Sequence, residues 1–284
     1  MTAQTTSTST PSFDERPREL NARFSDLLAS EWIKLWSLRS IPWAFAGTVA
    51  VILTITVTGA IADSGHYSGN DEQGKAYFRA FGTVSATFNT GAATMLIVGA
   101  GAIGAIAVLG EYTTGMIRTT FTAVPARRSV MAAKVAVTVA AATALGVAAA
   151  LLSYGAAQTV LSGQGVAVGL GHPGITRLII ASAALAPVAA LVGMGLAAVI
   201  RHSVLTIVVT IALLFVIPSV INGQSHFGAS LLHMTILQAW RRIGYDQAVG
   251  EMWPWTTGGA YIVLVVWALV AAALAVLTPN HRDQ

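Results

Sequence analysis

The segment EYTTGMIRTTFTAVPARRSVMAAK, residues 111–134, interrupts an otherwise apolar chain with charged residues, threonines, three arginines and one proline. The flanking runs, about 86–110 and 131–156, are almost free of charged residues. Each is long enough to cross a hydrocarbon core of ~30 Å as a helix, which takes ~20 apolar residues. We therefore predict that the segment connects two membrane-spanning helices.

The composition supports the same class of protein. Of the 284 residues 55% are hydrophobic and only 10% are charged, whereas about 25% of the residues in a soluble domain are charged. The apolar residues form long runs, not the short alternating segments of a membrane β-barrel. We predict an all-α polytopic membrane protein with a six-helix domain over 41–278. Its spans are expected at about 41–62, 86–110, 131–156, 177–200, 204–221 and 257–277.

Polar connections separate these predicted spans. Residues 63–79 and 157–175 are expected to be loops, and residues 222–256 form a long connection with an apolar part of its own. Residues 1–19, rich in threonine and serine, lack the apolar content to pack and are predicted to be a disordered tail.

Residues 20–38 have the pattern of an amphipathic helix. The apolar side would carry Leu20, Phe24, Leu27, Leu28, Trp32, Leu35 and Trp36, and the polar side Arg23, Asp26, Ser30 and Lys34. We predict that this helix lies on the membrane surface, with Trp32, Trp36 and Trp43 as anchors at headgroup depth. Glu31 falls inside the apolar arc, which does not fit this interpretation. The alternative is a soluble helix packed on a partner.

Lysine and arginine are distributed unequally between the two sides that six spans create. One side receives Arg16, Arg18, Arg23, Lys34, Arg39, Arg118, Arg127, Arg128, Lys134, Arg201 and Arg282, and the other receives Lys75, Arg79, Arg177, Arg241 and Arg242. Because basic residues are enriched in cytoplasmic loops, we predict a plasma-membrane protein with both termini and the 111–134 segment in the cytoplasm. The net charge of +4 sits at the ends of the spans, which does not indicate nucleic-acid binding.

The motif GAGAIG, residues 99–104, matches a dinucleotide-binding fingerprint. That fingerprint requires a preceding strand and a βαβ unit, and here the motif lies within a predicted span. We interpret Gly99, Gly101 and Gly104 as small residues that allow close helix packing.

Sequence signatures of catalysis are missing. The six histidines form no metal-ligand pattern, and the chain contains no HExxH, no GxSxG and no phosphate-binding GxxxxGK[ST]. We therefore expect no enzyme activity, metal or cofactor in this chain. A membrane-embedded enzyme or scaffold is an alternative. Such a protein would need polar residues that converge at one depth in the membrane, and the sequence predicts no such group. A secondary carrier is a further alternative, although the spans have few of the ionisable residues that mark ion paths.

The 111–134 segment also has internal order. Met116, Ile117, Phe121 and Val124 share one helical face, and Pro125 ends the helix. We predict a short amphipathic helix that docks into a groove on a soluble partner. The alternative is an ordinary positively charged cytoplasmic loop.

This pattern resembles a known family. Glu111, Gly115 and Pro125, followed by arginines and Lys134, are similar to the E-x3-G…P-x-x-R…K pattern of ABC-2 type transporter permeases. The amphipathic helix, six spans and long connection before the last span resemble that family over about residues 20–278.

The resemblance implies the membrane subunit of an ATP-driven exporter. Two separate ATP-binding subunits would hold ATP and magnesium, and a second permease subunit, identical or related, would complete the transporter. Residues 111–129 would couple to the ATP-binding subunit, through Glu111, Gly115, Met116, Arg118, Phe121, Pro125, Arg127 and Arg128. Spans two and five would face the substrate path, and short helices within 222–256 would dip into the outer leaflet. The uncharged spans favour a lipid, a hydrophobic drug or a peptide as substrate.

Overall fold

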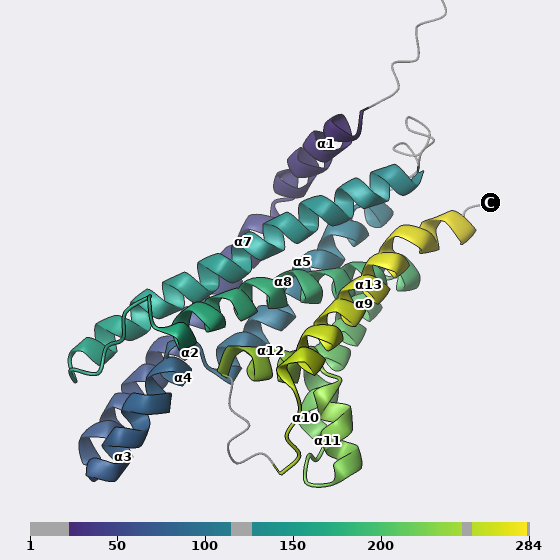
Figure 1. Cartoon of the computed structure of the whole chain (residues 1–284). Coiled ribbons are helices and arrows are strands. Elements are labelled where there is room, and N and C mark those ends of the chain that lie inside the picture. Colours follow the sequence, from purple (N-terminus) through teal and green to yellow (C-terminus); the bar gives the residue numbers. More distant parts are fainter. Residues whose placement is uncertain (1–22, 115–126, 246–251, 283–284) are drawn as a thin grey trace, which may run out of the picture.

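The structure, a computed structural model, describes residues 23–114, 127–245 and 252–282. It is 87% helical and contains no strand among these residues, which confirms the predicted all-α class. The long helices run roughly side by side across the molecule, and shorter helices lie at its two ends (Figure 1).

Six helical segments are long and apolar enough to cross a membrane, as predicted. They are α2 (Ser40–Gly69), α4 with α5 (Thr83–Thr87 and Thr90–Thr114), α7 (Arg127–Ser162), α8 (Pro173–Ile200), α9 continued by η2 and α10 (Ser203–Ile211, Ala212–Val216 and Ile217–Val220), and α13 (Thr257–Arg282). The chain is therefore a membrane-embedded protein. The fifth segment contains one π-helical turn, η2, before Pro218.

Five shorter elements complete the described fold: α1 (Phe24–Ser37), α3 (Glu72–Tyr77), the π-helix η1 (Phe78–Gly82), α11 (His226–His233) and α12 (Ile236–Tyr245). The predicted loop at 63–79 is wrong, because α2 continues to Gly69 and α3 and η1 follow it. The loop predicted from residue 157 likewise begins later, since α7 runs to Ser162. Polar residues end a membrane span but do not end a helix unless proline or a cap intervenes.

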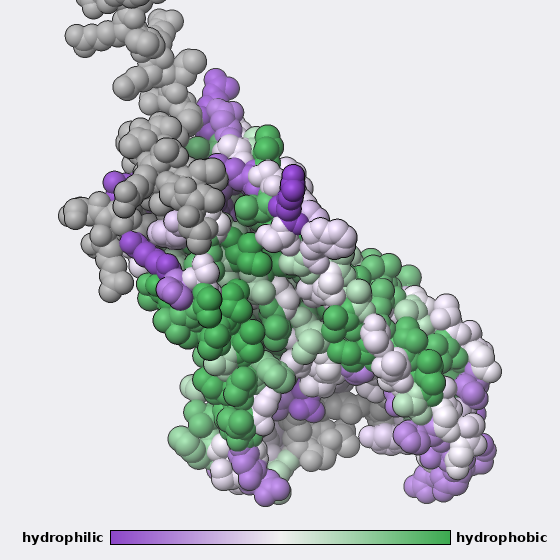
Figure 2. Space-filling model, turned by 180° about the vertical axis from the view of Figure 1, so that it is seen from behind, coloured by the Kyte–Doolittle hydropathy of each residue, from purple (hydrophilic) through white to green (hydrophobic). Residues whose placement is uncertain are grey.

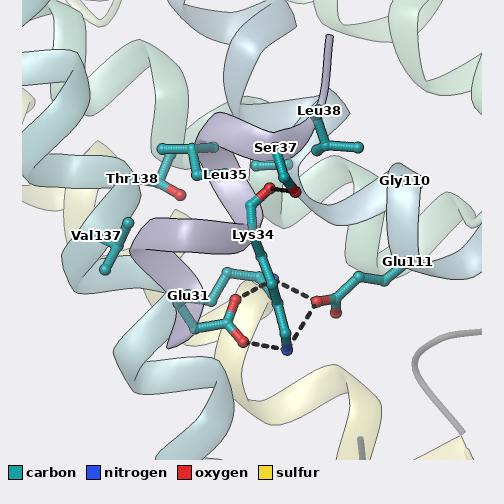
Figure 3. Close-up of a pocket in the computed structure, with 11 residues that line it drawn as sticks. Glu31, Lys34, Leu35, Ser37, Leu38, Gly110, Glu111, Val137 and Thr138 are labelled. Atoms are coloured by element: carbon teal, nitrogen blue, oxygen red, sulfur yellow. Dashed lines mark hydrogen bonds and ion pairs between the residues drawn. The ribbon is translucent and has the colours of Figure 1, made fainter. Parts of the chain in front are cut away.

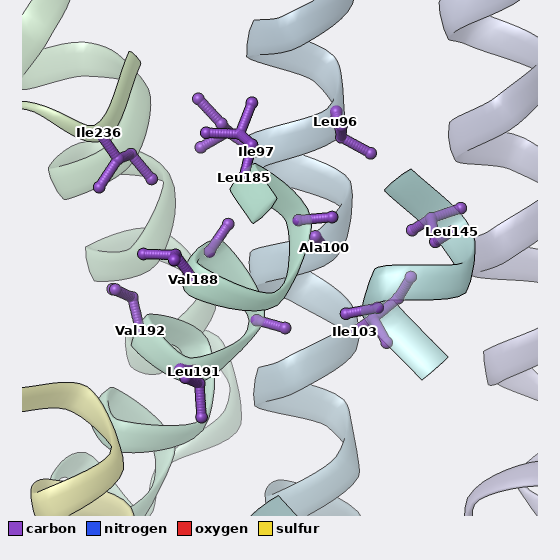
Figure 4. Packing of buried hydrophobic residues seen from close by; sticks show 14 of the residues in the cluster. Leu96, Ile97, Ala100, Ile103, Leu145, Leu185, Val188, Leu191, Val192 and Ile236 are labelled. Carbon is purple, nitrogen blue, oxygen red and sulfur yellow. The ribbon is translucent and has the colours of Figure 1, made fainter. Parts of the chain in front are cut away.

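The centre of the bundle is the crossing of α5 and α8. A Cβ atom added at Gly104 would overlap the carbonyl group of Ala190, and one at Gly193 would overlap that of Gly101. The two backbones are therefore almost in contact, and branched side chains such as Ile103 and Leu185 pack around the crossing (Figure 4). A Cβ atom added at Gly99 would overlap the side chain of Thr48 on α2. The interpretation of GAGAIG as a helix-packing motif is confirmed.

The bundle has two polar ends separated by a hydrophobic belt (Figure 2). The first, here the α1 end, holds α1, the end of α5 and the start of α7 (Figure 1). Arg201, between α8 and α9, also lies there, with its guanidinium 5.2 Å from the ring centre of Tyr112. The second, here the α11 end, holds α3, α11, α12 and the start of α8. Which end faces the cytoplasm stays a prediction.

Candidate functional site

Four charged side chains meet at the α1 end and form what we call the charge cluster: Glu31 and Lys34 of α1, Glu111 of α5 and Lys134 of α7. The Lys134 ammonium donates to Glu111 Oε1 at 2.8 Å and also to Glu31 Oε2. Lys34 donates to Glu31 Oε1 at 2.7 Å and lies 3.4 Å from Glu111 Oε1 (Figure 3). Each lysine therefore bridges both glutamates, and three helices are tied at one point.

The cluster is buried except for Lys34. Glu31, Glu111 and Lys134 are 3%, 5% and 5% exposed, while the Lys34 side chain is 29% exposed. Transferring a single charge from water into such a place costs several kcal/mol unless a partner compensates it. Two lysines and two glutamates sum to zero charge, so the arrangement satisfies this requirement internally.

The position of Glu31 follows from the way α1 packs. The buried residues of α1 are Leu27, Glu31 and Leu35, spaced four apart along one stripe. Leu27 packs against Val130 and Ala133 of α7. Glu31 is the middle member of this stripe, so its carboxylate points into the protein, where Lys134 of the same helix α7 meets it.

A second apolar side of α1 is not covered by the described part of the protein. Phe24, Trp32, Ile33 and Trp36 are between 38% and 68% exposed, and Trp36 packs on Phe45 at the start of α2. The predicted anchor Trp43 is 78% exposed. The apolar arc of the predicted amphipathic helix thus divides into a stripe that packs on α7 and an exposed apolar face.

Lys34 is the one member of the cluster at its rim. Partial burial lowers the pKa of its ammonium, but the hydrogen bond to Glu31 and the charges of Glu31 and Glu111 outweigh that effect. The net result is a pKa raised above the ordinary value of 10.5. Lys34 is therefore a cation at any physiological pH.

The cluster encloses little space. The cavity beside it has a volume of about 40 Å³ and is lined by the four charged residues together with Leu35, Ser37, Leu38, Ala107, Gly110, Val137 and Thr138. Sites for organic ligands measure about 300–1,000 Å³. The arrangement therefore suits a mechanical tie between helices and leaves no room for a substrate.

The predicted coupling residues are only partly described. Glu111 belongs to the cluster, Arg127 is half-buried and Arg128 is exposed at the start of α7. Gly115, Met116, Arg118, Phe121 and Pro125 lie outside the described residues. The predicted docking helix between them is therefore untested.

The expectation that no polar residues converge at one depth is wrong. It failed because the partners Glu31 and Lys134 are 103 positions apart, so no local pattern links them. One signal did exist: Glu31 interrupts the apolar arc of its helix. A charged residue on a face that must be buried calls for a buried partner of opposite sign.

Comparison with known protein families gives no match, and neither does comparison with curated proteins. The fold and the site thus define the chain only as a six-span helical membrane protein with a neutral, buried charge cluster at one end.

Proposed function

We propose that this chain is the permease subunit of an ATP-driven ABC exporter, and that an ATP-binding subunit docks on residues 111–129. The supporting observation is the ion pair between Glu111 and Lys134, 2.8 Å long and buried. Glu111 is the first residue of the segment proposed to receive the partner, and Lys134 follows its end. A push on that segment therefore acts on two helix ends that are joined to one another.

The contacts of these helices give the push a route into the bundle. Both α5 and α7 pack extensively along α8, and α5 crosses α8 at the tight glycine contact. Through Glu31, α1 is tied to the same point. Coupling between distant sites is carried by rigid elements of this kind, packed against one another. Movement of the partner would therefore tilt several spans together.

The remaining parts of the proposal follow from the resemblance to ABC-2 permeases. Two ATP-binding subunits hold ATP and magnesium, and a second permease subunit completes the path for a lipid, a hydrophobic drug or a peptide. Both termini face the cytoplasm of the plasma membrane, which gives the ATP-binding subunits access to residues 111–129.

The charge cluster bears on the alternative of a membrane-embedded enzyme. Its charges neutralise one another within hydrogen-bonding distance, and the adjoining cavity of about 40 Å³ is smaller than a substrate. Groups arranged in this way favour a structural tie over catalysis.

The test of the proposal is the ATPase rate of the reconstituted complex compared with that of the isolated ATP-binding chain. We expect Glu111→Ala and Arg118→Glu to abolish the effect of the permease on this rate while the protein still inserts in the membrane. Lys75→Ala, in an exposed ion pair at the α11 end, is the matched control and should leave the effect intact. Unchanged rates in both test variants would overturn the proposal.

Sidedness is tested independently. The chain contains no cysteine, so a single cysteine at Arg118 or Arg127 can be labelled without background. Both positions should react with a membrane-impermeant maleimide only after the cells are opened. Labelling of either position in intact cells would place the segment outside and exclude docking of a cytoplasmic ATPase.

A further inference from the structure

An apolar groove opens on the outer surface of the bundle, where α1, α2 and α7 meet. It has a volume of about 670 Å³ and is lined by Trp32, Trp36, Pro42, Phe45, Ala46, Val49, Ala50, Leu53, Ala141, Ala144, Leu145 and Ala148. None of these side chains carries a charge, a hydroxyl or an amide, and their polar atoms are the indole nitrogens of the two tryptophans. The groove is therefore suited to hydrocarbon.

Small side chains on two spans create this hollow. Ala46 and Ala50 of α2 are exposed, and so are Ala144 and Ala148 of α7. In each pair the residues are four positions apart, so both lie on the same face of their helix. Larger side chains at these positions would fill the space between the two helices. The groove can thus be closed by substituting alanines that the core of the protein does not use.

Aromatic rings form the wall at one end of the groove. The ring centres of Trp32 and Trp36 are 5.8 Å apart, and those of Trp36 and Phe45 are 5.3 Å apart. The second contact joins α1 to the start of α2. Because these rings pack on one another in the protein without any ligand, this end of the groove is already formed.

The same end has the residues expected at the headgroup level of a bilayer. Trp32 and Trp36 are 46% and 38% exposed, and tryptophan favours the boundary between hydrocarbon and polar headgroups. Arg39 lies in the turn between α1 and α2, midway in sequence between Trp36 and Pro42 of the groove. It is exposed and makes no hydrogen bond or ion pair with the residues that the structure describes. Its charge complements the phosphate that membrane phospholipids share.

The length of the groove corresponds to one leaflet. Along α2 it extends from Pro42 to Leu53, which is about 16 Å at ~1.5 Å per residue. A hydrocarbon core of ~30 Å gives each leaflet about 15 Å. A spanning helix of a second copy would need a groove that continues through both leaflets. The dimensions therefore favour a single acyl chain over a helix.

We propose that this groove binds one acyl chain of a phospholipid from the leaflet at the α1 end. The chain lies against α1, α2 and α7 together. Helix α1 is already tied to α7 through Leu27 and Glu31 on its buried stripe, and the lipid supports its exposed apolar face, which carries Trp32 and Trp36. The site is independent of the proposed export function, because its occupant is a resident lipid and needs no ATP-binding subunit.

The experiment counts the lipid that the purified chain retains. The protein, in a neutral detergent, is titrated with long-chain phosphatidylcholine, and bound lipid is measured by native mass spectrometry. We expect one phosphatidylcholine per chain to bind ahead of any other. Ala144→Phe and Ala148→Phe should each lower its retention about tenfold, because a phenyl ring and an acyl chain cannot share the space of a closely packed site.

Two controls separate the groove from general attraction of lipid to an apolar surface. Ala140→Phe places the same ring on an exposed alanine of α7, one turn earlier on the same face and outside the groove, and it should leave retention unchanged. A short-chain phosphatidylcholine keeps the headgroup and should compete poorly with the long-chain lipid. Thermal unfolding of each variant shows whether the fold is intact.

Three results would overturn the proposal. The first is equal retention by the double variant Ala144→Phe, Ala148→Phe and by Ala140→Phe. The second is full competition by the short-chain lipid, which would mean that the headgroup and not the chain is bound. The third is a lipid-free dimer that Ala148→Phe separates, which would assign the groove to a second copy of the chain. Because no ATPase is present, none of these results affects the coupling proposal.

Discussion

The two ends of the molecule place charged side chains in opposite surroundings. At the α1 end, two lysines and two glutamates pair with one another around a cavity of about 40 Å³. At the α11 end, Arg241 lines two cavities, of about 430 and 220 Å³, and Arg177 lines the larger one; none of their described lining residues is acidic. The comparison indicates that charge at the first end ties helices together, whereas Arg241 at the second end lies beside open space.

Burial is the physical reason for this difference. Lys134 is 5% exposed, and a cation in such a place destabilises the fold unless acceptors surround it. Arg241 is exposed, so water can satisfy its charge. The ends should therefore respond differently when charge is removed.

The largest effect is expected from Lys134→Met. The substitution leaves the carboxylates of Glu31 and Glu111 buried with Lys34 alone between them, and breaking a buried pair in this way costs about 3–5 kcal/mol. The free energy of unfolding, measured by titration with sodium dodecyl sulfate in mixed micelles, should fall by that amount.

Two further variants sharpen this measurement. Lys75→Met removes a lysine at the α11 end whose partner Glu72 is 82% exposed, and it should cost less than about 1 kcal/mol. The double variant Lys134→Met, Glu111→Gln removes one charge of each sign and should be more stable than Lys134→Met alone. An equal loss of unfolding free energy in Lys134→Met and Lys75→Met would refute the contrast between the two ends.

The next effect concerns the α5–α8 crossing, which connects the two ends. Gly104→Leu would force a side chain against the backbone of Ala190. Overpacking a core typically costs about 1–3 kcal/mol, and the upper part of that range is expected because a backbone carbonyl has little freedom to move. Gly47→Leu on α2, where a Cβ atom meets open space, is the control. Equal thermal unfolding temperatures for the two variants would contradict the packing argument.

The sequence predicts much of this fold because the bilayer imposes a simple rule on composition. The six spans follow from apolar runs of sufficient length, and Gly99, Gly101 and Gly104 indicate a close crossing before its partner is known. Helix ends are less predictable, as α2 shows by extending to Gly69. Hydropathy indicates where the chain leaves the bilayer. A helix ends where its backbone hydrogen bonds end, and hydropathy does not indicate that position.

The charge cluster is harder to predict, since its members come from three helices whose rotation the sequence does not give. Glu111 and Lys134 are recognised individually, but their partner Glu31 stands out only as a misfit on its own helix. The larger cavity at the α11 end is harder still to predict, because Arg177 and Arg241 come to line it only after α12 folds against α8. Contacts between residues so far apart in the chain leave no periodic pattern in the sequence from which they could be predicted.

A smaller effect is expected at the contact between α12 and α8. Trp240→Phe keeps an aromatic ring beside Phe88 but removes the hydrogen bond to Ser182 Oγ. A hydrogen bond of this kind contributes about 1 kcal/mol, so the free energy of unfolding should fall by about that amount. Trp43→Phe, at a position that is 78% exposed, should leave it unchanged. Equal stability of the two variants would show that the hydrogen bond to Ser182 does not hold α12 against α8.

The smallest effect is expected from Lys34→Met at the rim of the charge cluster, about 1 kcal/mol or less, because Lys134 still bridges the two glutamates and water reaches the site. The pH dependence of this stability difference tests whether the charge of Lys34 causes it. The pKa of Lys34 in the folded protein is raised above 10.5, so its contribution is fully present below about pH 10.5 and is lost as the pH rises through the folded-state value. The difference in unfolding free energy between wild type and Lys34→Met should therefore stay constant up to that pH and then shrink. A difference that disappears well below pH 10.5 would mean that the charge of Lys34 is not what stabilises the α1 end.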